Sequence, residues 1–264
     1  MTYKEHFVAL LWVLIAIVIS SCTFIPPERD LVTAQETIAR DGAEEWDLVI
    51  LGDSDLWLSY KYYVPMFEED LGIDIVVHNE IRPGTLSPTA VLRGNQRLQD
   101  LISEAEIIVF NVPFVFPGVG GACFNQSLSL EKDGCFGVTQ EEYAAWTSEM
   151  ITLIKELVGP RGAMIRLQNM FVPLEYWRSN EVRQERLEAC FECFSTYWDA
   201  QAEVAKDEGI PLVDVFSLLH GPNGDEDPYE KGYFDSDPIH VNDEGAKAIA
   251  ELYRSIGYEY WMPE

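Results

Sequence analysis

The chain has 264 residues, of which 47% are hydrophobic and 12% aromatic, and its 45 acidic and 18 basic residues give a formal net charge of −27. This length suits one large domain or two small ones, and the apolar content is sufficient for a packed core, which excludes disorder of the whole chain. Nucleic-acid binding normally needs a basic surface, so the charge excludes nucleic acid as the expected partner and favours neutral or cationic ligands over anionic ones.

Residues 1–21 are predicted to be a signal peptide. Thirteen uncharged apolar residues run from Phe7 to Ile19, which is short for a membrane span and typical of the apolar region of a signal peptide. The run ends in Ile19-Ser20-Ser21-Cys22, which resembles a bacterial lipobox. The resemblance implies cleavage before Cys22 and lipidation of this residue. An uncleaved anchor is the alternative, and in both cases we expect an exported protein that is held at a membrane by its N-terminus.

A spacer and one domain are expected after the signal peptide. Residues 22–45 contain Pro26-Pro27 and many charges, as expected of a spacer between the membrane and the domain that can include a short helix. No segment rich in Pro, Gly and Ser divides the remainder, so residues 46–264 are predicted to form a single domain.

Short apolar runs alternate with helical patterns along this predicted domain. The strand candidates, rich in Val and Ile, are Asp47–Leu51, Ile73–His78, Ile107–Val112, Ala163–Leu167 and Pro211–Val215. The helix candidates are Pro88–Glu104, Thr139–Leu157, Glu181–Glu208 and Asn242–Ile256. Continuous apolar strands are typical of parallel sheets that are buried on both faces. The alternation therefore predicts a three-layer α/β/α fold around a mainly parallel five-stranded sheet.

Four cysteines remain besides Cys22, namely Cys123, Cys135, Cys190 and Cys193. In an oxidising compartment they indicate two disulfides, for which three connectivities exist. We favour a bond between Cys123 and Cys135, because it closes a glycine-rich loop. Cys190 and Cys193 have the spacing of a redox or zinc pair, but the sequence nearby offers no second pair and no suitable histidine. A structural disulfide is therefore expected there, and no metal.

Ser54 is the candidate nucleophile, because it follows the first predicted strand in the sequence Leu51-Gly52-Asp53-Ser54. A serine hydroxyl needs a base within hydrogen-bonding distance, and the base needs a partner that fixes its tautomer. Asp237 and His240, three residues apart before the last helix, provide such a pair locally. Because the strand-to-helix loops of a parallel sheet share one edge, we expect the fold to bring the pair to Ser54. The alternative is an ordinary turn at Ser54 and a helix entry at His240.

Four blocks of the sequence resemble the SGNH (GDSL-type) hydrolases. They are Gly52-Asp53-Ser54, Asn79 with Gly84-Thr85, Asn111 in Val-Phe-Asn-Val-Pro, and Asp237-Pro-Ile-His240 before the helix start at Asn242. The resemblance extends from Trp46 to about Ile256. It departs from the family pattern at Asp55, where Leu is usual, and at Ile81, where Gly is common. The third block lacks the preceding Gly and the following Asp of Gly-x-Asn-Asp.

This resemblance implies a flavodoxin-like fold and a serine esterase that needs no metal or organic cofactor. Ser54 would attack an ester carbonyl, His240 would carry the proton to the leaving alcohol, and Asp237 would orient His240. The oxyanion would be held by the backbone N–H groups of Ser54 and Gly84 and by the side-chain amide of Asn111. Gly84 as a turn glycine and Asn111 as a strand-end residue are the alternative interpretations.

The expected substrate is an ester, with O-acetylated carbohydrate, lipid esters and small esters as the candidates. Acetylated carbohydrate is attractive because a membrane anchor keeps an exported enzyme near envelope polymers. Two other functions stay open at this point. One is an O-acyltransferase, and the other is a catalytically inactive surface lipoprotein of the same fold that binds a glycan or a protein partner.

Overall fold

The computed structural model describes residues 32–82, 88–112, 138–171, 184–224, 226–237 and 240–263. The predicted signal peptide and Cys22, and also Gly84, Cys123 and Cys135, lie outside these residues. Cys190 and Cys193 belong to a described helix, but their side chains lie outside the description, so the predicted disulfides stay predictions. No helix in the described ranges has both the length and the apolar character needed to cross a membrane.

The centre of the fold is a parallel sheet of five strands in the order β3-β2-β4-β5-β6. The strands are β2 (Glu45–Gly52), β3 (Asp74–Ile81), β4 (Ile107–Phe110), β5 (Met164–Gln168) and β6 (Leu212–Val213), and every neighbouring pair is parallel. The predicted fold class is confirmed. The order reverses at β2, which lies between β3 and β4. Ligands of open α/β sheets bind at such a reversal, outside the carboxyl ends of the strands.

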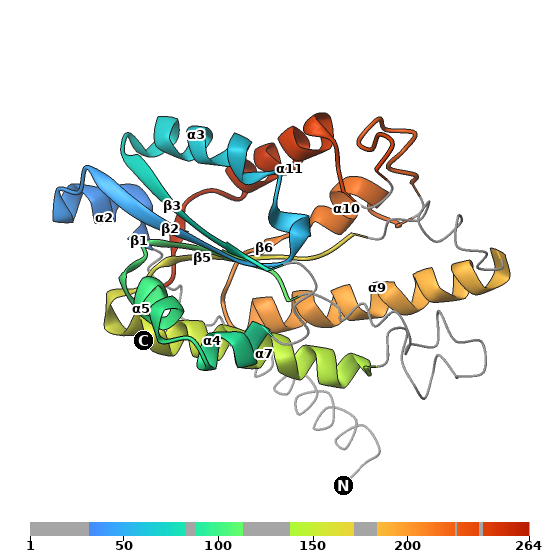
Figure 1. Cartoon of the computed structure of the whole chain (residues 1–264), viewed down its shortest axis with the longest axis horizontal. Helices are drawn as coiled ribbons and strands as arrows, with labels where there is room; N and C mark the ends of the chain where they lie inside the picture. Colours follow the sequence, from blue (N-terminus) through green and yellow to red (C-terminus); the bar gives the residue numbers. More distant parts are fainter. Residues whose placement is uncertain are drawn as a thin grey trace, which may run out of the picture. The chain divides into compact units, whose positions relative to one another are not determined.

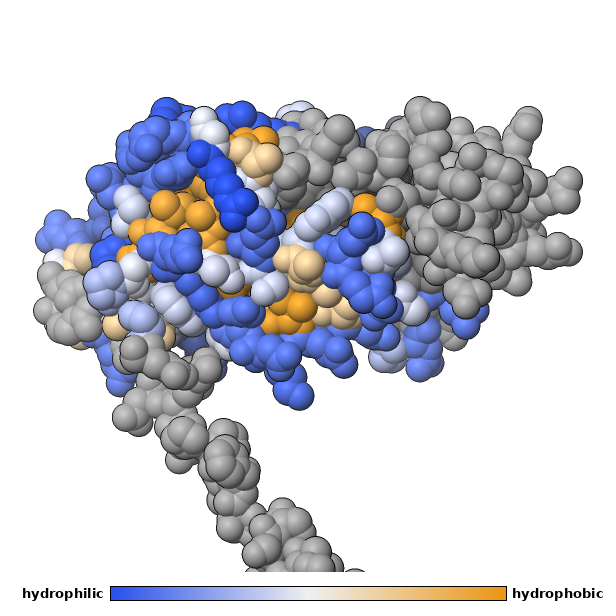
Figure 2. Space-filling model, turned by 90° about the horizontal axis from the view of Figure 1, so that it is seen from below, coloured by the Kyte–Doolittle hydropathy of each residue, from blue (hydrophilic) through white to orange (hydrophobic). Residues whose placement is uncertain are grey.

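Helices cover both faces of this sheet, as Figure 1 shows. One layer contains α4 (Pro88–Arg93), α5 (Gln96–Glu104), α7 (Gln140–Val158) and α9 (Gln184–Asp207). The other contains α3 (Tyr60–Leu71), α10 (Val215–His220) and α11 (Asp243–Ile256). Short 3-10 turns lie at Ser54–Leu56 and Gly159–Arg161. The surface on the side of α4 and α7 is mostly hydrophilic, with separate apolar patches, as expected from the net charge of −27 (Figure 2).

Local capping explains where several of the predicted helices begin. Thr139 and Glu142 form a capping box at the start of α7, and the Asn242 side chain accepts hydrogen bonds at the start of α11. The expected helix Pro88–Glu104 is divided in two, because the Asn95 side chain accepts from Leu98 N and starts α5 anew. Glycine at position 94, the residue before this cap, further weakens a continuous helix.

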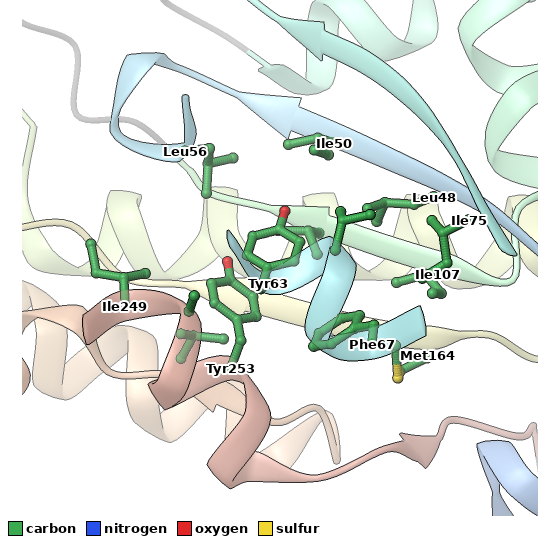
Figure 3. Packing of buried hydrophobic residues seen from close by; sticks show 14 of the residues in the cluster. Leu48, Ile50, Leu56, Tyr63, Phe67, Ile75, Ile107, Met164, Ile249 and Tyr253 are labelled. Atoms are coloured by element: carbon green, nitrogen blue, oxygen red, sulfur yellow. The ribbon is translucent and has the colours of Figure 1, made fainter. Parts of the chain in front are cut away.

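Helix α3 was not predicted, and packing rather than capping accounts for it. Its N-cap residue Ser59 makes no side-chain capping bond, and Pro65 lies inside the helix. Tyr63 and Phe67 are fully buried against α11, where the rings of Tyr63 and Tyr253 have centroids 4.4 Å apart (Figure 3). Aromatic burial of this kind stabilises a helix whose local signals are weak.

The folded unit begins upstream of the expected boundary at residue 46. Strand β1 (Val32–Thr33) pairs antiparallel with β7 (Glu259–Tyr260), and α2 (Ala34–Asp41) follows with its own capping box. Ala34 is completely buried, and its N–H donates to the Tyr258 carbonyl at 2.8 Å. Residues 32–45 are therefore part of the domain and not of a spacer, which corrects the predicted boundary.

Candidate active site

Ser54 is the first residue of the 3-10 turn Ser54–Leu56 that follows β2 at the carboxyl edge of the sheet. Its side chain is partly exposed. The chain turns at Gly52, whose φ of 139° is rarely adopted by residues with a side chain. A Cβ atom at position 52 would lie 1.8 Å from Oδ1 of Asn111, so only glycine fits there. The first block of the predicted site is thus a sharp turn that places a serine beyond the strand end.

Asn111 follows β4, the strand next to β2, and is completely buried. Its side-chain Oδ1 accepts from the backbone N–H of Asp53 at 3.0 Å, and its Nδ2 donates to the Asp53 carboxylate at 2.7 Å. Its backbone N–H donates to the Leu51 carbonyl at 3.1 Å. The structure therefore joins the first and third blocks of the predicted site directly. Whether Asn111 also donates to an oxyanion stays a prediction.

Asp237 and His240 form the local pair that the sequence predicts. Nδ1 of His240 lies 2.8 Å from Oδ2 of Asp237, and the backbone N–H of His240 donates to Oδ1 of the same carboxylate at 3.2 Å. A carboxylate only accepts hydrogen bonds, so Nδ1 carries a proton, and in the neutral imidazole Nε2 then has the lone pair. Nε2 is buried and makes no hydrogen bond within the described ranges, so the bond to Ser54 Oγ is not formed in this structure. Such bonds are often long without substrate and tighten when it binds.

Packing of α11 on α3 places this pair on the same side of the sheet as Ser54. The hydroxyl of Tyr62, near the start of α3, bonds to Asp243 at the start of α11, which raises the pKa of Tyr62. Lys247 lies 5.7 Å from the centre of the Tyr62 ring. Because α3 begins six residues after Ser54 and α11 three residues after His240, these contacts connect the helix that follows Ser54 to the helix that follows His240.

Glycine 84, the second-block donor, lies outside the described residues, so its role stays a prediction. The last described residue before Gly84 is Arg82, whose N–H donates to the Gly52 carbonyl at 2.8 Å. A cavity of about 300 Å³, counting the space open to solvent, lies at this strand end. It is lined by Leu51, Gly52, Glu80, Arg82, Val91, Leu92, Leu98 and Met150.

Two other histidines have different surroundings from His240. His220 is completely buried, with Nδ1 3.3 Å from the Glu226 carbonyl. His78 on β3 lies 2.7 Å from Asp47 of β2, a second His–Asp pair that the sequence does not reveal because its members are far apart in the chain. Within the described ranges no group of three His, Cys, Asp or Glu residues is placed to hold a metal ion.

Asp53 is the residue of this site that sequence reasoning passed over. It is 7% exposed, and it forms hydrogen bonds with both the amide oxygen and the amide nitrogen of the Asn111 side chain. The only signal for it is its place in Gly52-Asp53-Ser54, because its partner lies 58 residues away in the sequence.

Comparison with solved structures places this arrangement in a known fold. The lipase Lip_vut3 from a goat rumen metagenome is 18% identical, with a TM-score of 0.59 over 81% of this chain and 98% of that chain. A protein described as a GDSL-like lipase from Parabacteroides merdae is 13% identical, with a TM-score of 0.55 over 81% of this chain and 96% of that chain. An extracellular lipase from Streptomyces rimosus is also 13% identical, with a TM-score of 0.53 over 80% of this chain and 99% of that chain.

No model of a protein family matches the sequence, and no curated protein matches it. The evidence for the fold is therefore structural: the parallel sheet, its strand order and a likeness that covers nearly the whole of the three lipase chains. The chain has the three-layer α/β fold of the SGNH (GDSL-type) hydrolases.

Proposed function

We propose that the protein is a serine ester hydrolase, with Ser54 as nucleophile, His240 as general base and Asp237 as the partner that orients His240. The observation that carries the proposal is the hydrogen bond of 2.8 Å between Asp237 and Nδ1 of His240, which leaves Nε2 buried and without a partner in the described part of the chain. The serine follows the strand at which the sheet order reverses, where ligands bind in this class of sheet.

In the proposed reaction, Ser54 Oγ attacks the ester carbonyl carbon while its proton passes to Nε2 of His240. The carbonyl π electrons move to oxygen, and the ionised carboxylate of Asp237 stabilises the imidazolium. Collapse of the intermediate breaks the bond to the alcohol, which takes the proton from His240. Water then attacks the acyl-enzyme by the same two steps, which releases the carboxylic acid and restores Ser54.

Three donors are proposed for the oxyanion: the backbone N–H groups of Ser54 and Gly84, and Nδ2 of Asn111. Each such donor typically contributes a factor of about 10² to 10³ in kcat. The proximity of Asn111 to the turn that carries Ser54 supports its part, since both of its side-chain polar atoms contact Asp53.

An ester with a short acyl group, such as an O-acetylated carbohydrate, is the proposed substrate. The proposed membrane anchor at Cys22 would keep the enzyme near envelope polymers, which favours acetylated carbohydrate as the source of this ester. The three similar structures are of proteins described as lipases, which supports an ester as the substrate class. The net charge of −27 favours neutral or cationic esters over anionic ones.

The direct test uses the full chain, purified in mild detergent, and a chromogenic acetyl ester. Wild-type turnover that is lost in Ser54→Ala and in His240→Ala supports the proposal. Equal turnover in the wild type and both variants would contradict it. Comparison of acetylated xylan or another acetylated glycan with esters of longer acyl chains then identifies the substrate class.

An inactive binding protein of the same fold is the second candidate, and the unformed bond between Ser54 and His240 favours it. Reaction of Ser54 with a fluorophosphonate separates the two candidates, because only an activated serine is phosphonylated at an appreciable rate. An unlabelled wild type that is folded, together with specific retention on a glycan column, would support the binding protein.

Export and lipidation at Cys22 are also proposed, on the sequence Ile19-Ser20-Ser21-Cys22. Metabolic labelling with a palmitate analogue tests the anchor. Incorporation in the wild type and its loss in Cys22→Ala is the expected result, whereas equal labelling of the two chains would contradict lipidation at this residue.

A further inference from the structure

Asp53 is a buried carboxylate that takes no part in the proposed proton transfers. It forms two reciprocal bonds with Asn111: its backbone N–H donates to Oδ1 at 3.0 Å, and its carboxylate accepts from Nδ2 at 2.7 Å. A backbone N–H only donates and a carboxylate only accepts, so the reverse orientation of the Asn111 amide would lose both bonds. Asp53 therefore fixes which end of this amide is nitrogen.

One of the two N–H bonds of Asn111 Nδ2 is left over by this arrangement. An amide nitrogen carries two hydrogens, and the described part of the chain provides Nδ2 with a single partner, Asp53. The side chain is completely buried, and Oδ1 lies so near Gly52 that even a methyl group there would overlap it. The remaining N–H is thus attached to a side chain with little freedom to rotate, beside the turn that presents Ser54.

The backbone after Asn111 is held as well. The hydroxyl of Tyr143 donates to the Val112 carbonyl at 2.9 Å. Burial first, and the nearby charge of Asp53 second, raise the pKa of Tyr143, so this hydroxyl stays a neutral donor. Side chain and backbone are therefore fixed together around Asn111.

We propose that Asp53 is a positioning residue that holds the Asn111 amide so that its second N–H donates to the oxyanion. The inference rests on the proposed function and assigns Asp53 no contact with the substrate. It predicts that Asp53 acts on catalysis only through Asn111. Replacing a residue that merely stabilised the fold would lower stability, and its effect on kcat would not depend on the presence of Asn111.

A double-mutant cycle on the full chain tests this dependence, with kcat and KM measured on a chromogenic acetyl ester. Asp53→Ala and Asn111→Ala are each expected to lower kcat by about 10²-fold with KM nearly unchanged, as for loss of one oxyanion donor. The double variant is expected to lose no more than Asn111→Ala alone. Losses that multiply, or an unchanged kcat in Asp53→Ala, would overturn the inference.

Asp53→Asn tests rescue, because its side-chain oxygen still accepts from Nδ2. Its kcat is expected to lie within about tenfold of the wild type, well above that of Asp53→Ala. Asp214→Ala is the matched control, since Asp214 accepts from Asn169 Nδ2 at 2.6 Å in a second Asn–Asp pair that has no assigned part in catalysis. It is expected to lower the melting temperature while kcat stays within about threefold of the wild type. A kcat in Asp53→Asn as low as in Asp53→Ala would contradict positioning by this bond.

Hydrogen exchange of the Asn111 side-chain amide provides a readout that needs no turnover. Slow exchange is expected in the wild type and in Asp53→Asn, and fast exchange in Asp53→Ala. Equal exchange in the wild type and Asp53→Ala would overturn the inference even if Asp53→Ala were too unstable for kinetics. If the wild type shows no turnover, or a turnover that Ser54→Ala retains, the proposed function is overturned. If the wild type is active and Asp53→Ala is equally active, only this inference is overturned.

Discussion

Asp237 binds His240 twice within a segment of four residues, through the imidazole Nδ1 at 2.8 Å and through the backbone N–H at 3.2 Å. The same carboxylate therefore fixes both the ring and the turn that carries it. The side chain of Asp237 is 54% exposed, so the orientation comes from local geometry and not from burial. The pair is therefore formed within its own segment, and in the proposed reaction it acts as the base for Ser54.

Asp237→Asn is expected to lower kcat for ester hydrolysis by about 10³- to 10⁴-fold, because an amide in this position favours the wrong tautomer of His240. KM is expected to change little, since Asp237 makes no proposed contact with the substrate. Steady-state kinetics on a chromogenic acetyl ester provides the measurement. Asp235→Asn is the control, because Asp235 bonds to Asn242 and not to His240. Similar losses of kcat in Asp237→Asn and Asp235→Asn would show that the negative charge of this loop, and not the Asp237–His240 pair, supports catalysis.

Gly52→Ala is expected to abolish activity and to lower the melting temperature strongly. The new Cβ would lie 1.8 Å from Asn111 Oδ1, and the φ of 139° would be strained for alanine. Gly72→Ala is the matched control, since φ is 70° there and no atom lies within 4 Å of a Cβ. The control tests strain without a clash and is expected to lose about 1–2 kcal/mol. Thermal unfolding of both variants provides the measurement. Equal losses of stability in Gly52→Ala and Gly72→Ala would argue against a close contact between Gly52 and Asn111.

Features carried by adjacent residues were predictable from the sequence. The strands follow from apolar runs, the starts of α7 and α11 from capping residues, and the His240–Asp237 pair from a spacing of three. Asp53 was not predicted as a partner of Asn111, because only the parallel pairing of β2 with β4 brings these two residues together.

Features decided by distant packing were missed for the same reason. Helix α3 has no capping bond and contains Pro65, and its burial against Tyr253 is a property of the assembled fold. The start of the domain at Val32 depends on pairing with Tyr260 near the other end of the chain. Neither contact leaves a local pattern. Residues 32–45 are rich in charge, as a spacer is, although Thr33 and Glu36 form a local capping box there.

Asp70→Asn is expected to remove part of the acid sensitivity of the fold. Hydrogen bonds from Arg254 first, and from Tyr258 second, lower the pKa of Asp70. Because the folded-state pKa lies below the unfolded value of about 3.9, the stabilisation is present above that value and is lost as the pH falls through the folded-state pKa. The melting temperature of the wild type should thus exceed that of Asp70→Asn near neutral pH, and the gap should close on acidification.

Glu69→Gln is the control for this titration, because Glu69 lies 3.6 Å from the same guanidinium of Arg254 but is 73% exposed. Ion pairs of such exposure contribute little, so its melting temperature should follow that of the wild type at every pH. A gap between the wild type and Asp70→Asn that stays constant from about pH 7 to about pH 2 would rule out the titration of Asp70 as the cause.

A chain that begins at Trp46 is expected to be less stable than one that begins at Val32, by about 2 kcal/mol or more. The shorter chain loses the pairing of β1 with β7 and the hydrogen bond from Ala34 N to the Tyr258 carbonyl, and it uncovers the surface that buries Ala34. Denaturant unfolding of the two chains provides the measurement.

Strand β7 loses its partner β1 in the shorter chain but is still held in place by Arg166. Arg166 is completely buried on β5, and its guanidinium donates to the Gly257 carbonyl at 2.8 Å and to the Glu259 carbonyl at 3.2 Å. Because β7 stays attached through Arg166, the loss of stability measures residues 32–45, which comprise β1, α2 and the first residue of β2, with the hydrogen bond from Asp74 N to the Glu44 carbonyl. Equal stability of the two chains would mean that residues 32–45 rest on the domain without stabilising it, as the charge pattern of the sequence first predicts.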